Sequence, residues 1–369
     1  MKKVLFLIHD LGGGGAEKVL VNLVNRLGDD GYNITLISLF GGGVNEKKLN
    51  KKINYRSIFK HTFPGNSHLF KLFSPKTLHR WIVKEKYDIE VSYLEGPSAR
   101  IISGCMNDES KKLCWIHIQQ RSMKIASKSF RNYHEALNCY KGFDQIACVS
   151  DSVQEDFLSI FPELTNTYIV PNIVELSDIK NIKCGKQILS TESPGCFKLI
   201  GIGKLLSSKG FDKLIRITGK LRKAGLDIET WILGEGKERD SLLRLARDEN
   251  IDRYIHLVGY VQNPYLYLSQ SDLFVCCSSS EGYSTAATEA MILGIPIVTT
   301  PVAGSYELLG SLSKIGIAED FSLKALEEKI AHLLNNQEAY RQYKTLTQHE
   351  SKKFNSTELY KRNLLFLNK

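Results

Sequence analysis

Short apolar runs alternate with helix-spaced apolar positions through the first half of the chain. Residues 4–8 form an uninterrupted apolar run, and residues 16–27 then place apolar side chains three and four positions apart. Further apolar runs predict strands at 33–40, 89–93, 113–116 and 145–149. Strands that alternate with helices are typical of parallel sheets covered by helices on both faces.

The alternation restarts after a polar stretch at 175–195, which contains Ser, Pro and Gly and lacks a clear period. Beyond this linker, the pattern predicts strands at 197–201, 229–233, 255–257, 272–277 and 296–300. It predicts helices at 209–224, 240–249 and 285–293, and further helices between 323 and 369. The sequence therefore predicts an α/β protein of two Rossmann-like, doubly wound domains.

Cysteine usage and the apolar runs bear on the cellular compartment. The eight cysteines include no Cys-x-x-Cys pair, and Cys276 and Cys277 lie inside an apolar run, so reduced buried thiols fit better than disulfides or zinc. The apolar run at the start is too short for a signal peptide, and no run approaches the ~18 residues that span a bilayer. We expect a cytoplasmic protein, with contact at the inner face of the cytoplasmic membrane left open.

The net charge of +9 is concentrated in one segment. Residues 47–131 contain 18 Lys/Arg and 6 Asp/Glu, and the rest of the chain is slightly acidic. Between 70 and 86 the basic residues are mixed with large apolar ones, a composition that can bind an anionic membrane. A solvated helix with its apolar residues on the core has the same composition. A nucleic-acid partner is not expected, because no known binding motif accompanies the charge.

Two glycine-containing loops follow strands and precede helices. The first, residues 12–17, is rich in glycine, which lets the backbone approach a ligand, and it opens a helix whose N-terminus favours phosphate. It is not a P-loop, because Val19 stands where that motif has a magnesium-binding hydroxyl. In the second loop, Gly203 is followed by Lys204 and Lys209, whose compact charges suit phosphate oxygens.

A third group follows the predicted strand at 272–277. Gly282 permits a tight turn, and the amides of 284–286 open a helix towards a phosphate. Glu281 can accept hydrogen bonds from sugar hydroxyls and Glu289 from ribose hydroxyls. Two carboxylates beside a diphosphate would repel it unless they bind hydroxyls, so this placement is chemically specific.

These motifs together resemble the family 4 retaining glycosyltransferases of the GT-B fold. The two glutamates with seven residues between them, followed by Ala-Met-Ile-Leu-Gly-Ile-Pro-Ile-Val, are similar to the family's most specific signature. Other landmarks match in order: Gly14-Gly15-Ala16-Glu17, Pro171-Asn172, Gly203-Lys204-Leu205 with Lys209-Gly210, and Leu233-Gly234-Glu235-Gly236. The resemblance spans almost the whole chain.

The resemblance implies two domains facing across a cleft: an acceptor-side domain at 1–175 and a nucleotide-sugar-binding domain at 176–351. A C-terminal helix at about 352–369 is expected to pack back on the first domain. The implied catalytic residues are His117, Glu281, Lys204 and Lys209. The implied donor-binding residues are Gly14, Gly15, Gly203, Gly234, Val261, Gly282, Tyr283, Ser284, Thr285, Ala286 and Glu289.

Two departures from the family pattern concern the donor. Lys204 stands where the family most often has arginine, so the charge is kept but bidentate geometry is lost. Residues 282–285 read Gly-Tyr-Ser-Thr rather than Gly-Phe-Pro or Gly-Phe-Gly, which leaves the donor sugar open. No Asp-x-Asp motif occurs, so we expect neither a metal nor another cofactor.

The reaction implied is transfer of a hexosyl or N-acetylhexosaminyl group, with retention, from a nucleoside-diphosphate donor that we expect to be a UDP-sugar. The acceptor would be a hydroxyl of a glycan or lipid-linked glycan, as in capsule or lipopolysaccharide biosynthesis. Two alternatives stay open. One is a UDP-sugar epimerase of the same fold, and the other is a non-catalytic GT-B subunit that binds a partner transferase.

Overall fold

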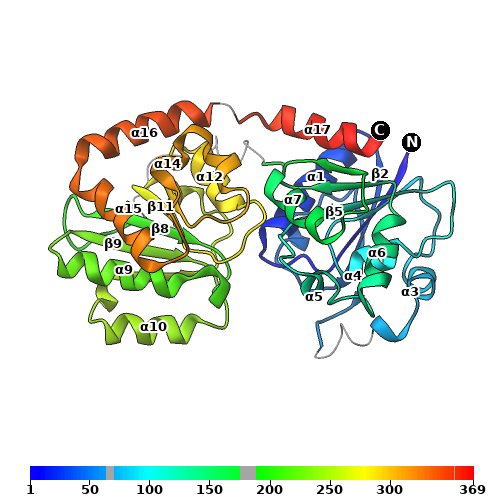
Figure 1. Cartoon of the computed structure of the whole chain (residues 1–369), viewed down its shortest axis with the longest axis horizontal. Coiled ribbons are helices and arrows are strands. Elements are labelled where there is room, and N and C mark those ends of the chain that lie inside the picture. The colour runs from blue at the N-terminus through cyan, green and yellow to red at the C-terminus, as the bar shows by residue number, and fades with distance from the viewer. Residues whose placement is uncertain (64–69, 175–187, 353) are drawn as a thin grey trace. The chain divides into compact units, whose positions relative to one another are not determined.

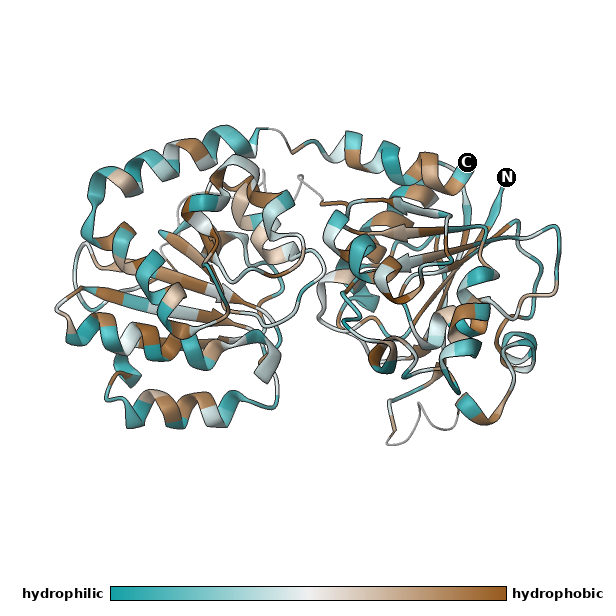
Figure 2. Cartoon of the chain, in the orientation of Figure 1, coloured by the Kyte–Doolittle hydropathy of each residue, from teal (hydrophilic) through white to brown (hydrophobic). Residues whose placement is uncertain are grey.

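The computed structural model describes residues 1–63, 70–174, 188–352 and 354–369. It divides into two compact units (Figure 1), one formed by Met1–Ile173 with Thr357–Lys369 and the other by Val174–Ser356. The predicted boundary between 175 and 176 lies outside the described residues. Figure 2 shows that apolar residues gather on the strands and polar residues on the outward helix faces, as expected for sheets covered by helices.

The first unit contains a seven-stranded parallel sheet in the order β3-β2-β1-β4-β5-β6-β7. Its strands are β1 (Lys3–Ile8), β2 (Asn33–Phe40), β3 (Asn54–Phe59), β4 (Ile89–Ser92), β5 (Lys111–Ile116), β6 (Gln145–Cys148) and β7 (Thr167–Ile169). The strand order reverses between β1 and β4, and open α/β sheets bind ligands at such a point, beyond the carboxyl ends of the strands.

Two strands of this sheet were not predicted from the sequence. β3 is an edge strand whose residues are partly exposed, so it has no continuous apolar run. β7, at the other edge, is only three residues long. Edge position and short length both remove the apolar signal on which the strand prediction rests.

Helices cover this sheet, and their apolar faces form part of its core. They are α1 (Gly15–Asp29), α3 (Pro75–Ile82), α4 (Pro97–Ile102), α5 (Met123–Ala126), α6 (Tyr133–Lys141) and α7 (Asp151–Ile160), with a 3₁₀ turn, η1, at Glu46–Lys48. In α1 the buried residues recur at helical spacing, which agrees with the pattern predicted at 16–27.

The last helix of the chain, α17 (Ser356–Asn368), belongs almost entirely to the first unit. The Phe366 ring contacts Trp115 at a centroid distance of 4.7 Å. Asn363 Nδ2 donates to the Pro171 carbonyl at 3.1 Å, and the Tyr360 hydroxyl donates to Asp30 at 2.5 Å. Aromatic packing and partly buried hydrogen bonds thus hold the end of the chain against its first unit.

The second unit contains a five-stranded parallel sheet in the order β10-β9-β8-β11-β12, with α9 on one face and α12 on the other (Figure 1). Its strands are β8 (Phe197–Ile202), β9 (Ile228–Leu233), β10 (Ile255–Gly259), β11 (Leu273–Cys276) and β12 (Ile297–Thr299). Its helices are α9 (Phe211–Lys223), α10 (Arg239–Asp248), α11 (Tyr265–Ser269), α12 (Thr285–Ile292), α13 (Ser305–Leu309), α14 (Ser313–Gly316), α15 (Leu323–Asn335) and α16 (Gln337–Ser351). The 3₁₀ turns are η2 (Ser207–Lys209), η3 (Asp252–Tyr254) and η4 (Gly310–Leu312).

The helix predicted at 209–224 begins later than expected. Gly210 adopts a left-handed conformation with φ of 65°, which ends η2 and forces α9 to start at Phe211. A Cβ at Gly210 would also overlap the carbonyl oxygen of Cys277. A glycine with positive φ between two helical segments is invisible to a periodicity argument, which explains the error.

The cysteines of the described chain are free thiols, and all but Cys105 are buried. Cys184 lies outside the described residues. Among the described helices, none is both long and apolar enough to cross a bilayer.

Candidate active site

The second unit brings Lys209 and Glu281 together at the point where its strand order reverses. Lys209 ends the loop after β8, and Glu281 lies in the loop after β11. Lys209 Nζ lies 2.5 Å from Glu281 Oε1, and Ser278 Oγ donates to the same oxygen at 2.6 Å. The Lys209 and Glu281 side chains are 25% and 14% exposed, so this ion pair is partly shielded from water and open to a ligand.

Close backbone contacts hold the loops that carry this pair. Leu205 N donates to Glu235 O at 2.9 Å, and Ser279 N donates to Ser208 O at 2.8 Å. Gly234 has a φ of 145°, and a Cβ there would overlap the Gly203 carbonyl oxygen. The glycine at 234 is therefore required by the packing of the loop after β9 on the loop after β8.

The Lys209 side chain passes over Gly203, where an added Cβ would lie 3.6 Å from Lys209 Cδ and Cε. Lys204, by contrast, is exposed on the surface of the same loop. Of the two predicted lysines, Lys209 is the one whose ammonium group the structure pairs with Glu281.

The N-terminus of α12 follows Glu281 directly. Ser284 is its N-cap, and its hydroxyl accepts from Ala287 N at 3.3 Å. The amides of Thr285 and Ala286 lie in this first turn, where the helix dipole favours negative charge. The predicted residues from Gly282 to Ala286 therefore form one continuous turn beside the ion pair.

A second glycine supports this turn and was missed from the sequence. Gly304 follows β12 with a φ of 74°, and a Cβ there would lie 2.7 Å from both Gly282 O and Tyr283 Cδ2. Only a residue without a side chain fits here against the turn. The available signal was the glycine in Pro-Val-Ala-Gly, which directly follows a predicted strand.

Glu289 lies about one turn into α12 and is 5% exposed. The Tyr265 hydroxyl donates to Glu289 Oε1 at 3.3 Å. Tyr265 belongs to α11 and was not predicted, because an aromatic residue in an apolar helical pattern gives no functional signal. Val261 lies in the loop between β10 and α11 and is partly buried against the core of this unit.

In the first unit the glycine-rich loop is held by side chains from its own sheet edge. Gly12 N donates to Asp10 Oδ1 at 2.7 Å, and Asn45 Nδ2 donates to Gly12 O at 2.5 Å. Gly14 is the N-cap of α1, which begins at Gly15. A Cβ at Gly14 would overlap the Glu17 carboxylate. The structure thus places Gly14 and Gly15 at a helix N-terminus, the position expected for an anion-binding loop.

His117 follows β5 of the same sheet and carries an unsatisfied buried atom. His117 is 9% exposed, and its Nε2 has no hydrogen-bond partner among the residues that the structure describes. Burial lowers the pKa of His117 to about 3, so the imidazole is neutral at physiological pH. Buried polar atoms are almost always hydrogen-bonded in folded proteins. An unpartnered Nε2 therefore points to a ligand that supplies a polar group.

Glu95 is a further candidate that sequence reasoning missed. It follows β4, at the point where the first sheet reverses its strand order, and its Oε2 accepts from the His117 amide at 2.9 Å. Burial raises the pKa of Glu95, although the amide bond from His117 opposes this. The available signal was Leu-Glu-Gly-Pro directly after a predicted strand. Glu95 fixes the backbone from which His117 projects.

Gly14, Gly15 and His117 belong to the first unit, and the other predicted site residues belong to the second. Each group follows strand ends of a parallel sheet, where α/β proteins bind ligands. The second group combines an ammonium, a helix N-terminus and two carboxylates. This set can hold a diphosphate between hydroxyl-bearing groups, and its fixed charges can stabilise charge that develops on a leaving phosphate.

Comparison with known proteins agrees with this chemistry. Residues 13–178 match the family described as Glycosyltransferase Family 4, and residues 190–349 match glycosyl transferases group 1. The chain is 25% identical over 350 residues to an uncharacterized glycosyltransferase of Haemophilus influenzae, covering 93% of each chain. It is 23% identical, over the full length of both, to the Campylobacter jejuni N-acetylgalactosamine-N,N'-diacetylbacillosaminyl-diphospho-undecaprenol 4-alpha-N-acetylgalactosaminyltransferase.

The fold is also that of solved glycosyltransferase structures. HepE from Anabaena, in complex with UDP and glucose, superposes with a TM-score of 0.75 at 16% identity, covering 100% of both chains. The two matched families follow each other along the chain and lie one in each unit. With one Rossmann-like unit for each matched domain, the chain belongs to the family 4 and group 1 glycosyltransferases of the GT-B fold.

Proposed function

We propose that this glycosyltransferase moves a hexosyl or N-acetylhexosaminyl group from a UDP-sugar to a hydroxyl of a glycan or lipid-linked glycan, with retention of anomeric configuration. The UDP assignment is supported by HepE, whose structure contains UDP and glucose. The acceptor assignment is supported by the Campylobacter relative, whose name specifies a diphospho-undecaprenol-linked sugar. The proposed role is assembly of a bacterial surface polysaccharide, with no metal or other cofactor in the transfer step.

The Lys209–Glu281 ion pair beside α12 is the observation that carries the proposal. Lys209 and the amides of the first turn of α12 would stabilise the negative charge of the departing diphosphate. Among the described residues, Lys209 and Ser278 donate to Glu281, both at Oε1, which would leave Oε2 for hydroxyls of the donor sugar. Glu289 would bind the ribose hydroxyls, with Tyr265 holding its carboxylate.

The first unit offers groups of its own that suit a nucleotide-sugar donor. Gly14 and Gly15 would approach the diphosphate through their backbone, and the neutral His117 would use Nε2 to donate to a hydroxyl of the donor sugar. We propose a front-face substitution through an oxocarbenium-like state, in which the leaving phosphate helps to deprotonate the acceptor hydroxyl. Exclusion of water would limit hydrolysis of the donor.

We also propose peripheral contact with an anionic membrane through the basic segment at 47–131. α3 buries Leu78 and Ile82 in the core, while Trp81 and Leu72 are 51% and 71% exposed. Exposed apolar side chains among lysines and arginines suit the boundary between lipid headgroups and acyl chains. A flotation assay with anionic vesicles at physiological salt tests this contact, and absence of binding would contradict it.

The donor assignment is tested in two steps on the full chain. A thermal-shift screen of UDP- and GDP-sugars first identifies the donor. UDP affinity and sugar transfer are then measured for Lys209→Met, Glu281→Gln and Glu289→Ala, with the exposed α15 residues in Lys324→Met and Glu328→Gln as matched controls. The anomeric configuration of the product is read by NMR.

The three variants should differ in a defined way. Lys209→Met should weaken UDP binding by about tenfold, because it removes a cation from the diphosphate. Glu281→Gln should leave UDP affinity unchanged or higher while transfer falls about 100-fold, because the carboxylate binds the sugar and not the nucleotide. Glu289→Ala should lower both UDP affinity and sugar transfer. Full transfer activity in Lys209→Met and Glu289→Ala would contradict the assigned site, and release of a free epimer without acceptor would favour the epimerase.

A further inference from the structure

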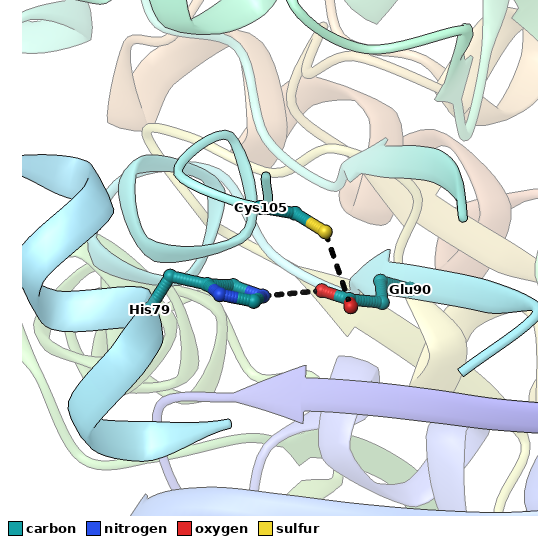
Figure 3. Close-up of side chains that lie close together, drawn as sticks. All are labelled: His79, Glu90 and Cys105. Carbon is teal, nitrogen blue, oxygen red and sulfur yellow. Dashed lines mark hydrogen bonds and ion pairs between the residues drawn. The ribbon is translucent and has the colours of Figure 1, made fainter. Parts of the chain in front are cut away.

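A cluster of three potential metal ligands lies in the first unit, away from the residues assigned to the donor (Figure 3). His79 comes from α3, Glu90 from β4 and Cys105 from the turn after α4. Their ligand atoms lie within 4.8 Å of one another. Nε2 of His79 is 2.6 Å from Glu90 Oε2, and Sγ of Cys105 is 3.3 Å from Glu90 Oε1. Among the described residues, no other three His, Cys, Asp or Glu gather in this way.

The cluster lies toward the amino ends of the strands, whereas His117 and Glu95 follow their carboxyl ends. Glu90 is the second residue of β4, at its amino end, whereas Glu95 follows the carboxyl end of the same strand. The strands of this sheet are parallel, so all their carboxyl ends lie on the same side of the sheet, opposite the amino ends. The three side chains therefore serve neither the diphosphate nor the donor sugar.

Burial makes this cluster costly as an ordinary part of the core. The Glu90 side chain is 2% exposed and the His79 side chain 13%. Desolvation of a carboxylate costs several kcal/mol, and a buried ion pair often adds less stability than apolar residues of similar size would. In the structure the three groups form a hydrogen-bonded network, in which the Cys105 thiol donates to the Glu90 carboxylate.

The donor set matches the preferences of Zn²⁺. One imidazole nitrogen, one carboxylate oxygen and one sulfur are all zinc ligands, whereas a thiolate does not suit Mg²⁺ or Ca²⁺. The Asn107 amide donates to Cys105 Sγ at 3.4 Å, and such a bond favours the thiolate that a metal requires. Because the ligands are 11 and 15 residues apart, no metal-binding spacing marks them in the sequence.

A fourth coordination position would face a cavity of about 200 Å³ that His79 and Glu90 line. Lys76, Arg80 and Lys86 also line this cavity, together with Glu85, so three cationic side chains face one carboxylate besides Glu90. Three protein ligands with one open position are typical of zinc sites that bind water or an exogenous ligand. The excess of cationic over anionic side chains would favour water, hydroxide or a small anion such as a phosphate or carboxylate at the open position.

We propose that His79, Glu90 and Cys105 bind one Zn²⁺ through Nε2, a carboxylate oxygen and Sγ, with an open fourth position facing this cavity. Binding displaces two protons to solvent, the thiol proton of Cys105 and the Nε2 proton that His79 donates to Glu90, and replaces the hydrogen bonds to Glu90 with bonds to the metal. The proposed Zn²⁺ site uses only these three side chains, so it does not depend on the assignment of the donor site.

The test uses the untagged full chain after removal of metal with a chelator. Zn²⁺ is titrated by calorimetry, and Co²⁺ serves as a spectroscopic probe because a cysteine ligand gives a sulfur-to-cobalt charge-transfer band in the near ultraviolet. The variants are Cys105→Ser and Glu90→Gln. The matched controls are Cys139→Ser, at another buried thiol of the same unit, and His134→Ala, at an exposed imidazole.

We expect one Zn²⁺ per chain and a charge-transfer band with Co²⁺ in the wild type and in both controls. Cys105→Ser should abolish the band, and Glu90→Gln should weaken Zn²⁺ binding more than about 100-fold, since even outer partners of metal ligands are worth about 10- to 100-fold. Circular dichroism checks folding, and the wild-type cobalt spectrum alone decides whether sulfur is a ligand. Absence of stoichiometric binding, loss of the band in Cys139→Ser, or its retention in Cys105→Ser would overturn the proposal.

Discussion

At the scale of single residues, burial fixes the protonation state of His117 in the absence of a ligand. The residue is 9% exposed, and burial lowers the pKa of its imidazole to about 3. The group therefore enters a reaction as a neutral donor or acceptor and not as a cation. Its unpartnered Nε2 is ready to bind a sugar hydroxyl without prior loss of another hydrogen bond.

The same burial predicts a pH dependence of stability. The folded-state pKa of His117 lies below the ordinary value of about 6.5, so the unfolded chain binds the proton first as pH falls. The contribution is present above about pH 6.5 and is lost progressively down to about pH 3. Between pH 7 and pH 5 the wild type should lose about 2 kcal/mol relative to His117→Gln, which carries no titrating ring.

Urea unfolding of both proteins at the two pH values measures this difference. His134→Gln, at an exposed histidine of the same unit, is the control and should show the wild-type pH dependence. An equal loss of stability in the wild type and in His117→Gln would show that His117 is not buried as a neutral group.

The sequence selected Lys209 and Glu281 in loops that follow strands, and Glu289 inside the helix that comes next. The structure places the first two in direct contact. Tyr265 could not be selected, because its hydroxyl meets Glu289 only through the packing of two helices distant in sequence. Their roles in donor binding remain predictions.

At the scale of elements, the loops after β8 and β9 depend on glycines whose geometry the structure makes explicit. Gly234→Ala should cost more than about 3 kcal/mol, because the new Cβ meets the Gly203 backbone and φ is 145°. Gly225→Ala is the matched control, with φ of 85° but nothing within 4 Å of the added Cβ, and should cost about 1 kcal/mol. Thermal unfolding midpoints and UDP affinity of the two variants test this difference. Equal effects would show that positive φ alone, and not contact between the loops, requires glycine at 234.

Element prediction succeeded wherever a strand was central. β1 and β2 were placed within a residue, because their residues are buried almost without exception. The edge strands β3 and β7 were missed, since half-exposed or very short strands carry no apolar run. The start of α9 was wrong because Gly210 breaks the helix through backbone conformation and not through hydrophobicity.

At the scale of the whole molecule, the chain returns to its first unit at the end. Phe366 is 5% exposed and contacts Trp115 and Tyr168 of that unit. Phe366→Ala should therefore destabilise the first unit by about 3–4 kcal/mol. Leu365→Ala, at a neighbouring side chain that is 69% exposed, should change stability by less than about 0.5 kcal/mol.

Hydrogen–deuterium exchange of peptides from β5 reads out the first unit separately from the second. Faster exchange in β5 for Phe366→Ala, with unchanged exchange in β8, is the expected result. Equal protection of β5 in both variants would show that α17 adds little to the stability of the first unit.

The sequence by itself determined the periodicities, and these specify two parallel sheets, their helices and the strand ends where polar residues follow. Those features are local, since apolar spacing and glycine or lysine after a strand are properties of neighbouring residues. Tertiary structure alone decided which distant groups meet. It paired Lys209 with Glu281, left His117 Nε2 without a partner among the described residues, and gathered His79, Glu90 and Cys105. These contacts depend on how helices and strands pack around each core, which no local pattern encodes.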